Sequence, residues 1–358
     1  MIERDDLRAA VAAGVVTEAQ AARLTAMSEE RRGIRAIMGP SDEPFELFRG
    51  LNEIFIVVGL TILYFGWLAV TGLTIFNNLG AAPVSVVGLS IVALFAIVAA
   101  AQYFTIIRRM VAPSIALACL AGLSLFQMGL GFASIEDATI GAKATITSAT
   151  VFTGLLLYWW YFRVPFTLAL IGAAALAFCY SLSLANGAAV LDLENAFLLS
   201  AEGPFALITI ALGLAALIIA IRFDLSDPHR VTRRSANGFW LHVVAAPAIV
   251  NTVALTLLEA DTAASNLLLL AFLLVIALFA IIIDRRSFLM AGAGYAVALS
   301  VIVLEEGASV VILALGFGLV ILGAKWEAIR GWLLAGIPEF PGKDRLPPWT
   351  ASTGKDTS

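Results

Sequence analysis

The chain has 358 residues, of which 61% are hydrophobic and 13% are charged, and its formal net charge is −4. An average soluble domain is nearer half apolar and a quarter charged. With a mean hydropathy of +0.95, the apolar excess is too large for a globular core and indicates burial in lipid. The negative net charge argues against a nucleic-acid partner, because such binding needs a basic surface.

The cysteine and histidine content argues against a disulfide framework or a metal centre. Cys119 and Cys179 both lie in apolar runs, so we expect no structural disulfide. The two histidines, His229 and His242, are not part of a Cys/His cluster, so we expect no zinc site. The sequence also contains no GxSxG, P-loop or HExxH motif. It therefore predicts no catalytic residue, no metal and no cofactor.

The polar residues 1–35 predict a short cytoplasmic helical hairpin. Leu7 and Val11 share a helix face, and Gly14 is suited to end the first helix. Thr17 followed by Gln20 is a capping-box pattern that starts a second helix. A hairpin of this size is too small to fold alone, so it must dock on something. Two alternatives remain open: it packs on its own membrane domain, or it binds a cytoplasmic protein partner.

An amphipathic linker is predicted over residues 36–51, followed by a transmembrane domain over 52–336. A bilayer core needs about 20 apolar residues per helix, and the continuous apolar runs make strands a poor alternative. The predicted fold class is all-α, a polytopic helical bundle of about ten spans. The predicted spans are 52–73, 82–104, 111–133, 145–162, 165–185, 204–221, 239–258, 266–284, 287–304 and 308–325.

The positions of the basic residues predict the orientation, since cytoplasmic loops collect Lys and Arg. With ten spans, 21 of the 22 Lys and Arg residues fall on one side, and only Lys143 falls on the other. The opposite loops carry acids such as Glu136, Asp192 and Glu259. We therefore expect a multi-pass protein of the bacterial inner membrane with both termini in the cytoplasm.

The last part of the chain, residues 337–358, is predicted to be a Pro-rich cytoplasmic tail. Trp326 and Trp332 come shortly before it, near a proposed cytoplasmic helix end. The headgroup layer of a membrane favours amphipathic aromatic rings at such positions. This placement agrees with the orientation predicted from the basic residues.

Helical-hairpin repeats are suggested by arginine clusters that recur roughly every 55–60 residues, the length of two spans with loops. After several of these clusters comes a helix with small residues at steps of four, which let helix backbones approach closely. The three stripes are Ser114, Ala118 and Gly122; Ala169, Ala173, Ala177 and Ser181; and Gly292, Ala296 and Ser300. We expect these helices to form a tight inner layer. Chance is the alternative, because Ala and Gly are abundant.

The most unusual predicted span is 239–258. Pro247 removes a backbone donor inside it, and Asn251 and Thr252 follow at midspan depth. His242 lies about one turn inside the cytoplasmic end and can titrate near neutral pH. These residues predict a polar cavity, with a kinked packing helix as the alternative. Three further polar candidates, each alone better suited to an interhelical hydrogen bond than to a ligand contact, are Gln127, Tyr180 and Tyr295.

Two carboxylates, Glu53 and Asp284, are predicted at cytoplasmic helix ends. Arg49 precedes Glu53 by one turn, and Arg285 directly follows Asp284. Both carboxylates are therefore expected to be satisfied charges and not relay groups. The spans carry no midspan carboxylate, which weakens the case for a proton-driven pump.

Three short stretches resemble a known family. They are GFWLHVVAAPA from Gly238 to Ala248, KWEAIR from Lys325 to Arg330, and Leu346-Pro347-Pro348. Together with the N-terminal hairpin, they are similar to an uncharacterised family of proteobacterial polytopic inner-membrane proteins that begin with such a cytoplasmic helix pair. The resemblance implies an inner-membrane location and carries over no catalytic residue. The chain departs from the family at Asn251, where we would expect histidine, and this weakens a histidine-based site.

The sequence favours small-molecule transport or channel-like passage, centred on the helix that contains Pro247. The alternative is a non-enzymatic membrane scaffold or sensor that uses residues 1–35 to bind a cytoplasmic partner. A membrane enzyme acting on lipid-linked substrates comes third, because an acid–base constellation cannot be assembled from the sequence. A hydrated cavity that reaches Asn251 would distinguish a transporter from a close-packed scaffold.

Overall fold

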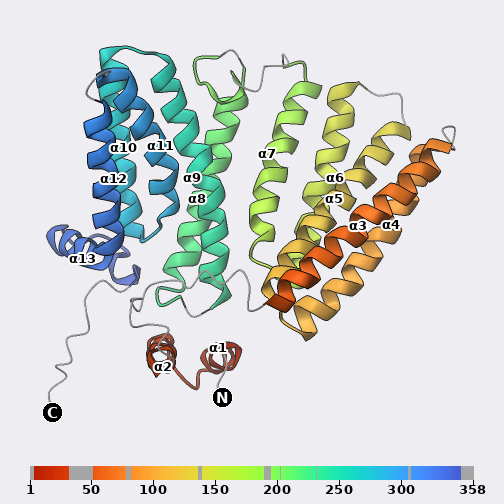
Figure 1. The fold of residues 1–358 in the computed structure, drawn as a ribbon, viewed down its shortest axis with the longest axis horizontal. Helices are drawn as coiled ribbons and strands as arrows, with labels where there is room; N and C mark the ends of the chain where they lie inside the picture. The colour runs from red at the N-terminus through yellow and green to blue at the C-terminus, as the bar shows by residue number, and fades with distance from the viewer. Residues whose placement is uncertain are drawn as a thin grey trace. The chain divides into compact units, whose positions relative to one another are not determined.

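The computed structural model describes residues 4–31, 51–77, 82–135, 139–188, 195–201, 203–230, 232–304 and 308–347. All regular secondary structure within these ranges is helical (Figure 1). The predicted all-α helical bundle is therefore confirmed. Nearly all of the predicted linker over 36–51, including Arg49, lies outside the described residues, as does the tail after Pro347.

Each of the ten predicted spans coincides with one helix. Eight helices in the described ranges are long and apolar enough to cross a membrane, and a bent pair of helices adds a ninth if it counts as one span. The chain is thus a multi-pass integral membrane protein. The helices are α3 (Leu51–Asn77), α4 (Ala82–Ala101), α5 (Val111–Ile135), α6 (Ile140–Phe162), α7 (Thr167–Ala185), α8 (Phe205–Leu225), α9 (Arg233–Glu259), α10 (Ala263–Ile283), α11 (Ser287–Leu304) and α12 (Ala308–Ala324).

The two largest boundary errors are at helix starts: α9 begins at Arg233, six residues before the predicted 239, and α6 begins five residues before the predicted 145. Helix α6 begins at Ile140, because the Thr139 side chain caps it by accepting a hydrogen bond from the Ala142 backbone N–H at 3.3 Å. The first turn contains Lys143, which lowers the local hydropathy. A search for apolar runs therefore begins the helix too late. Hydropathy therefore located the apolar part of α6 and missed its capped end.

The chain divides into two compact units. The first comprises residues 45–196 and 201–212 and contains α3 to α7. The second comprises residues 1–44, 197–200 and 213–358 and contains α9 to α12, with the division falling inside α8. We describe each unit by itself.

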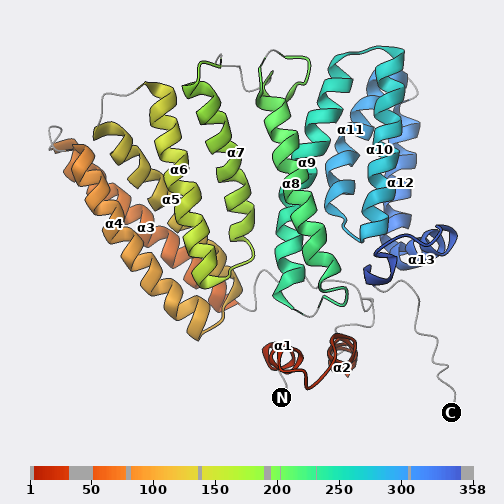
Figure 2. The ribbon, with the colours of Figure 1, turned by 180° about the vertical axis from the view of Figure 1, so that it is seen from behind.

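In the unit of α3 to α7, α5 is the central helix, since it contacts α3, α4, α6 and α7 (Figure 2). Leu117, Ala118 and Ala121 of α5 are buried in one cluster with Tyr158 and Phe162 of α6. Small residues allow this packing, because close approach of helix backbones requires short side chains in membranes. Between α4 and α5 the chain forms a π-helix over Gln102–Ile107.

The small-residue stripes predicted on α5 and α7 differ in burial. On α5, Ser114 and Ala118 are buried, as the predicted inner layer requires. On α7, Ala173 and Ala177 are exposed, so the prediction is wrong for that helix within its own unit. Helix α7 buries Ala174 instead, one position around its surface. In such Ala-rich helices the sequence does not specify which of several possible stripes faces a neighbour.

In the second unit, α9 is the most enclosed helix. From Ser235 to Leu258, all of which are described, every residue is buried or half-buried. Helix α9 contacts α10 and α11, and it meets α8 at Gly213, where an added Cβ would lie 3.0 Å from the Cβ of Ala248. Pro247 does not end α9, which continues to Glu259.

The second unit also contains a short helix, α13 (Trp326–Gly336), that lies across the end of α12 (Figure 1). The two helices meet at an angle of 85°. After α13 a short 3₁₀ helix spans Lys343–Arg345. Lys343 is buried and its Nζ donates to the Ile337 carbonyl at 2.7 Å, so the described first part of the predicted tail folds back on itself.

The N-terminal hairpin consists of α1 (Arg4–Ala12) and α2 (Glu18–Arg31). Gly14 lies between them at φ +71°, a conformation that favours glycine. The predicted capping box is present: the Thr17 N–H donates to Gln20 Oε1 at 2.9 Å, and the Gln20 N–H donates to Thr17 Oγ1 at 3.3 Å. Leu7 of α1 and Ala21 of α2 are buried.

Candidate functional site

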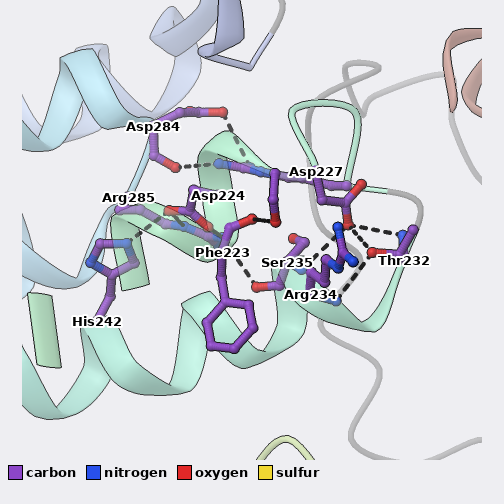
Figure 3. A network of polar contacts seen from close by, with 11 residues as sticks. Phe223, Asp224, Asp227, Thr232, Arg234, Ser235, His242, Asp284 and Arg285 are labelled. Atoms are coloured by element: carbon purple, nitrogen blue, oxygen red, sulfur yellow. Dashed lines mark hydrogen bonds and ion pairs between the residues drawn. The ribbon is translucent and has the colours of Figure 1, made fainter. Parts of the chain in front are cut away.

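The last turn of α8 places a carboxylate, Asp224, among apolar helices. A negative charge at a helix C-terminus is unfavourable with the helix dipole, so it needs cationic partners. Arg285, in the connection between α10 and α11, donates from Nε to Oδ2 at 3.1 Å and from Nη2 to Oδ1 at 2.5 Å (Figure 3). Both side chains are buried, and this two-bond geometry is the strong form of such a pair.

Two features of α9 accommodate this ion pair. At Gly238 an added Cβ would lie 2.4 Å from Asp224 Oδ1, so only glycine leaves room for the carboxylate. The carbonyl of Ser235 accepts a further hydrogen bond from Arg285 Nη2 at 3.2 Å. The first two turns of α9 therefore pack directly against the Asp224–Arg285 ion pair.

His242 is the third member of this group. It is fully buried, and its Nε2 lies 2.8 Å from Asp224 Oδ2. The ring packs edge-on against Phe288 with the ring centroids 5.9 Å apart. Because an ionised carboxylate only accepts hydrogen bonds, Nε2 carries the proton. Nδ1 has no hydrogen-bond partner among the residues that the structure describes, which leaves it as the position where the ring can gain or lose a proton.

A second ion pair, between the half-buried Arg230 and the buried Asp284, lies beside the first. Asp284 ends α10 in the left-handed conformation at φ +59°. Arg230 pairs with its Oδ2 at 3.2 Å and donates to its backbone carbonyl at 2.7 Å. The indole N–H of Trp326 donates to Asp284 Oδ1 at 2.5 Å. The prediction that Asp284 is a satisfied charge is confirmed, but its partners are distant in sequence, and the adjacent Arg285 bonds to Asp224 instead.

Charged side chains cap two helix ends in the same region, and each has the charge opposite to that of the helix end it caps. Asp227 Oδ2 accepts from the backbone N–H of Thr232 at 2.9 Å and of Ser235 at 3.3 Å, at the start of α9. Arg330 donates to the carbonyl of Ile281 at 3.1 Å, at the end of α10. An anion at a helix N-terminus and a cation at a C-terminus both complement the helix dipole.

We call Asp224, Arg230, His242, Asp284, Arg285 and Trp326 the polar network. Its members connect α8, α9, the end of α10 and the start of α13. Figure 3 shows Asp224, His242, Asp284 and Arg285 of this network. Ion pairs within it are screened from solvent, and each carboxylate has a cationic partner. The network can therefore hold charge and a proton among apolar helices. Its hydrogen bonds and ion pairs also connect these helices to one another.

The seven residues predicted to line a polar cavity fall in two different units. His242, Pro247, Asn251 and Thr252 follow one another along α9, and Tyr295 lies on the neighbouring α11. At 1.5 Å per residue, His242 and Thr252 are about 15 Å apart along the helix axis. They thus form a line along one helix and not a compact cluster. That they border a common cavity stays a prediction.

Gln127 and Tyr180 belong to the unit of α3 to α7. Gln127 Oε1 accepts from the Tyr64 hydroxyl at 3.2 Å, and Ser124 donates to the same hydroxyl at 3.0 Å. Tyr180 is hydrogen-bonded to Thr209. Both are interhelical hydrogen bonds of the kind that holds membrane helices together, as expected for each residue taken alone.

Glu53 of α3 is buried and acts on another helix. Its Oε2 accepts from the backbone N–H of Ala112, near the start of α5, at 3.2 Å. This is the favourable place for a carboxylate, since helix N-termini present unpaired N–H groups. The expectation of a satisfied charge is therefore confirmed, with a backbone partner that the sequence did not indicate.

Most of the polar network was missed from the sequence, and only His242 was singled out as a candidate. From the sequence, Arg230 and Arg285 are loop charges that set the orientation, and Asp224 has no predicted role. One signal was available: Asp224 and Asp227 form an acidic pair beside an apolar run, on the side where basic residues dominate. No protein-family model, curated protein or solved structure matches the chain.

Proposed function

We propose that the protein is a small-molecule transporter or channel-like protein of the bacterial inner membrane, with α9 lining the pathway. The observation that carries this proposal is the fully buried His242, bonded to the Asp224–Arg285 pair inside apolar helices. Ionisable groups in membrane helices cost about 2.5–3.5 kcal/mol each at the helix centre on insertion scales, and those that membrane helices retain commonly mark ion or substrate pathways.

Two further features of α9 support the proposal. Pro247 cannot donate a hydrogen bond to the carbonyl four residues before it, so the Val243 carbonyl lacks its usual helical donor. Asn251 follows one turn later and is half-buried. A proline and a polar side chain one turn apart on an enclosed helix provide groups that can face a hydrated pathway.

The experiment that tests this proposal measures water access to Asn251. In a background in which Cys119 and Cys179 are replaced by alanine, we expect Asn251→Cys in membrane vesicles to react with a charged, membrane-impermeant thiol reagent. The matched dry control is Leu274→Cys, which is 63% exposed in the middle of α10, a helix apolar enough to cross the membrane. A reaction at 251 no faster than at 274 would contradict a hydrated pathway along α9.

A second function, a non-enzymatic scaffold or sensor, is favoured by a separate observation on the hairpin. Val15 is 75% exposed, and Leu24 and Met27, three residues apart on α2, are also exposed. Exposed apolar side chains that share a helix face are suited to a protein partner. An unreactive Asn251→Cys would therefore favour this function over transport.

The hairpin also lies close to the connection between α8 and α9 of the same unit. Burial raises the pKa of the Glu18 carboxyl above its ordinary value, and the negative charge of Asp227 raises it further, whereas His229 and Arg234 act in the opposite direction. The start of α2 thus lies near the connection between α8 and α9. A partner that bound the exposed face of α2 would act next to the residues that cap α9.

A further inference from the structure

Helix α13 begins where the apolar part of the second unit ends. The 17 residues of α12 span about 25 Å, close to the roughly 30 Å of a bilayer core. Helix α13 then turns by 85°. If α12 crosses the membrane, α13 runs along the membrane plane near the boundary between hydrocarbon and headgroups.

One face of α13 is fixed to the protein. Trp326, Arg330 and Leu334, at steps of four, are all buried. Trp326 donates to Asp284, and Arg330 donates to the Ile281 carbonyl. Because a helix face with three buried anchors cannot rotate freely, the opposite face has a defined direction.

That opposite face consists of Ala328, Trp332 and Ala335, which are exposed. Trp332 is 78% exposed, although a large aromatic ring is costly to leave in water. Lys325 and Glu327, at the start of α13, are exposed too, and charged groups are costly in hydrocarbon. Neither bulk water nor the bilayer core suits this combination, whereas the headgroup layer accepts both tryptophan rings and basic side chains.

We propose that α13 is an interfacial helix and that its face of Ala328, Trp332 and Ala335 binds the phospholipid headgroup layer. The anchored face then fixes the depth of α10 and α12 in the membrane. It also holds the Asp284–Trp326 bond of the polar network at the level of the headgroups. This inference is independent of transport, because it rests on the geometry of α12 and α13 and on the exposure of α13.

Spin-label depth measurements test the proposal in phosphatidylcholine vesicles. In the cysteine-free background, single labels are placed by Trp332→Cys and, as a second position on the same face, by Ala335→Cys. The control for hydrocarbon is Leu313→Cys, at a 74% exposed position of α12, and the control for water is Val15→Cys, at a 75% exposed position of the hairpin. Accessibility to oxygen and to a water-soluble nickel chelate gives the depth of each label.

We expect the labels at 332 and 335 to have a nickel accessibility between those at 313 and 15. Nickel accessibility at both positions equal to that at 15 would place this face in water and overturn the proposal. Values at both equal to that at 313 would overturn it as well, because α13 would then continue into the hydrocarbon as part of a broken span. A split result, with one label at either extreme, would also contradict a face that lies flat in one layer.

Discussion

Asp224→Asn is expected to lower the free energy of unfolding by about 3–5 kcal/mol, the usual cost of breaking a buried ion pair by removing one partner. The substitution keeps the shape of the side chain but leaves the positive charge of Arg285, which is 3% exposed, without its carboxylate. Titration with SDS in mixed micelles, followed by circular dichroism, gives the free energy.

Two further variants distinguish charge from shape in this prediction. Asp261→Asn is the matched control, because Asp261 is exposed and asparagine tolerates its positive φ; we expect a change within about 0.5 kcal/mol. The double variant Asp224→Leu with Arg285→Met removes both charges and should recover the part of the lost stability that is due to the unpaired charge, although the Nε2–H of His242 loses its acceptor. Equal stability of Asp224→Asn and the wild-type protein would contradict the buried ion pair.

Gly129→Ala is expected to destabilise the unit of α3 to α7. A Cβ at this position would lie 2.7 Å from the Thr147 Cα and 3.0 Å from the Thr147 carbonyl oxygen, so α5 and α6 must separate. Overpacking of this kind costs about 1–3 kcal/mol. The measurement is the same SDS titration.

The matched control for Gly129 is Gly122→Ala on the same helix. The only atom close to an added Cβ there is Leu155 Cδ2, at the ordinary contact distance of 3.8 Å. Both substitutions gain about the same helix propensity, roughly 1 kcal/mol, so the difference between them isolates the contact of α5 with α6. If the two variants have the same stability, α5 and α6 do not approach each other as described.

The positions of the helices could be predicted because lipid imposes a simple requirement. About 20 consecutive apolar residues are needed to cross a bilayer, and this length is visible without any knowledge of packing. The same uniform apolar character hides which face of a helix meets its neighbours. This is why the buried stripe of α7, at Ala174, was misjudged. The start of α6 was missed for a different reason, because its first turn, capped by Thr139 and containing Lys143, is less apolar than the rest of the span.

The polar network could not be predicted because its bonds connect distant parts of the chain. Arg285 could pair with its sequence neighbour Asp284 or with Asp224, and only the packing of α8 against α9 at Gly238 decides for Asp224. A counting rule for basic residues also treats every arginine as a solvated loop charge. It gives no indication that Arg230 and Arg285 turn inward. His242 was recognised because a histidine within an apolar span is conspicuous by itself.

The most direct test of the account concerns whether α8 crosses the membrane with its acidic end and the polar network on the cytoplasmic side. Ser200 and Ser226 flank α8 and are both exposed, so each accepts cysteine with little change. In intact cells with the cysteine-free background, we expect a membrane-impermeant maleimide to label Ser200→Cys at once. Ser226→Cys should be labelled only after the cells are permeabilised. Labelling of Ser226→Cys from outside intact cells, or labelling of both positions only after permeabilisation, would contradict the account.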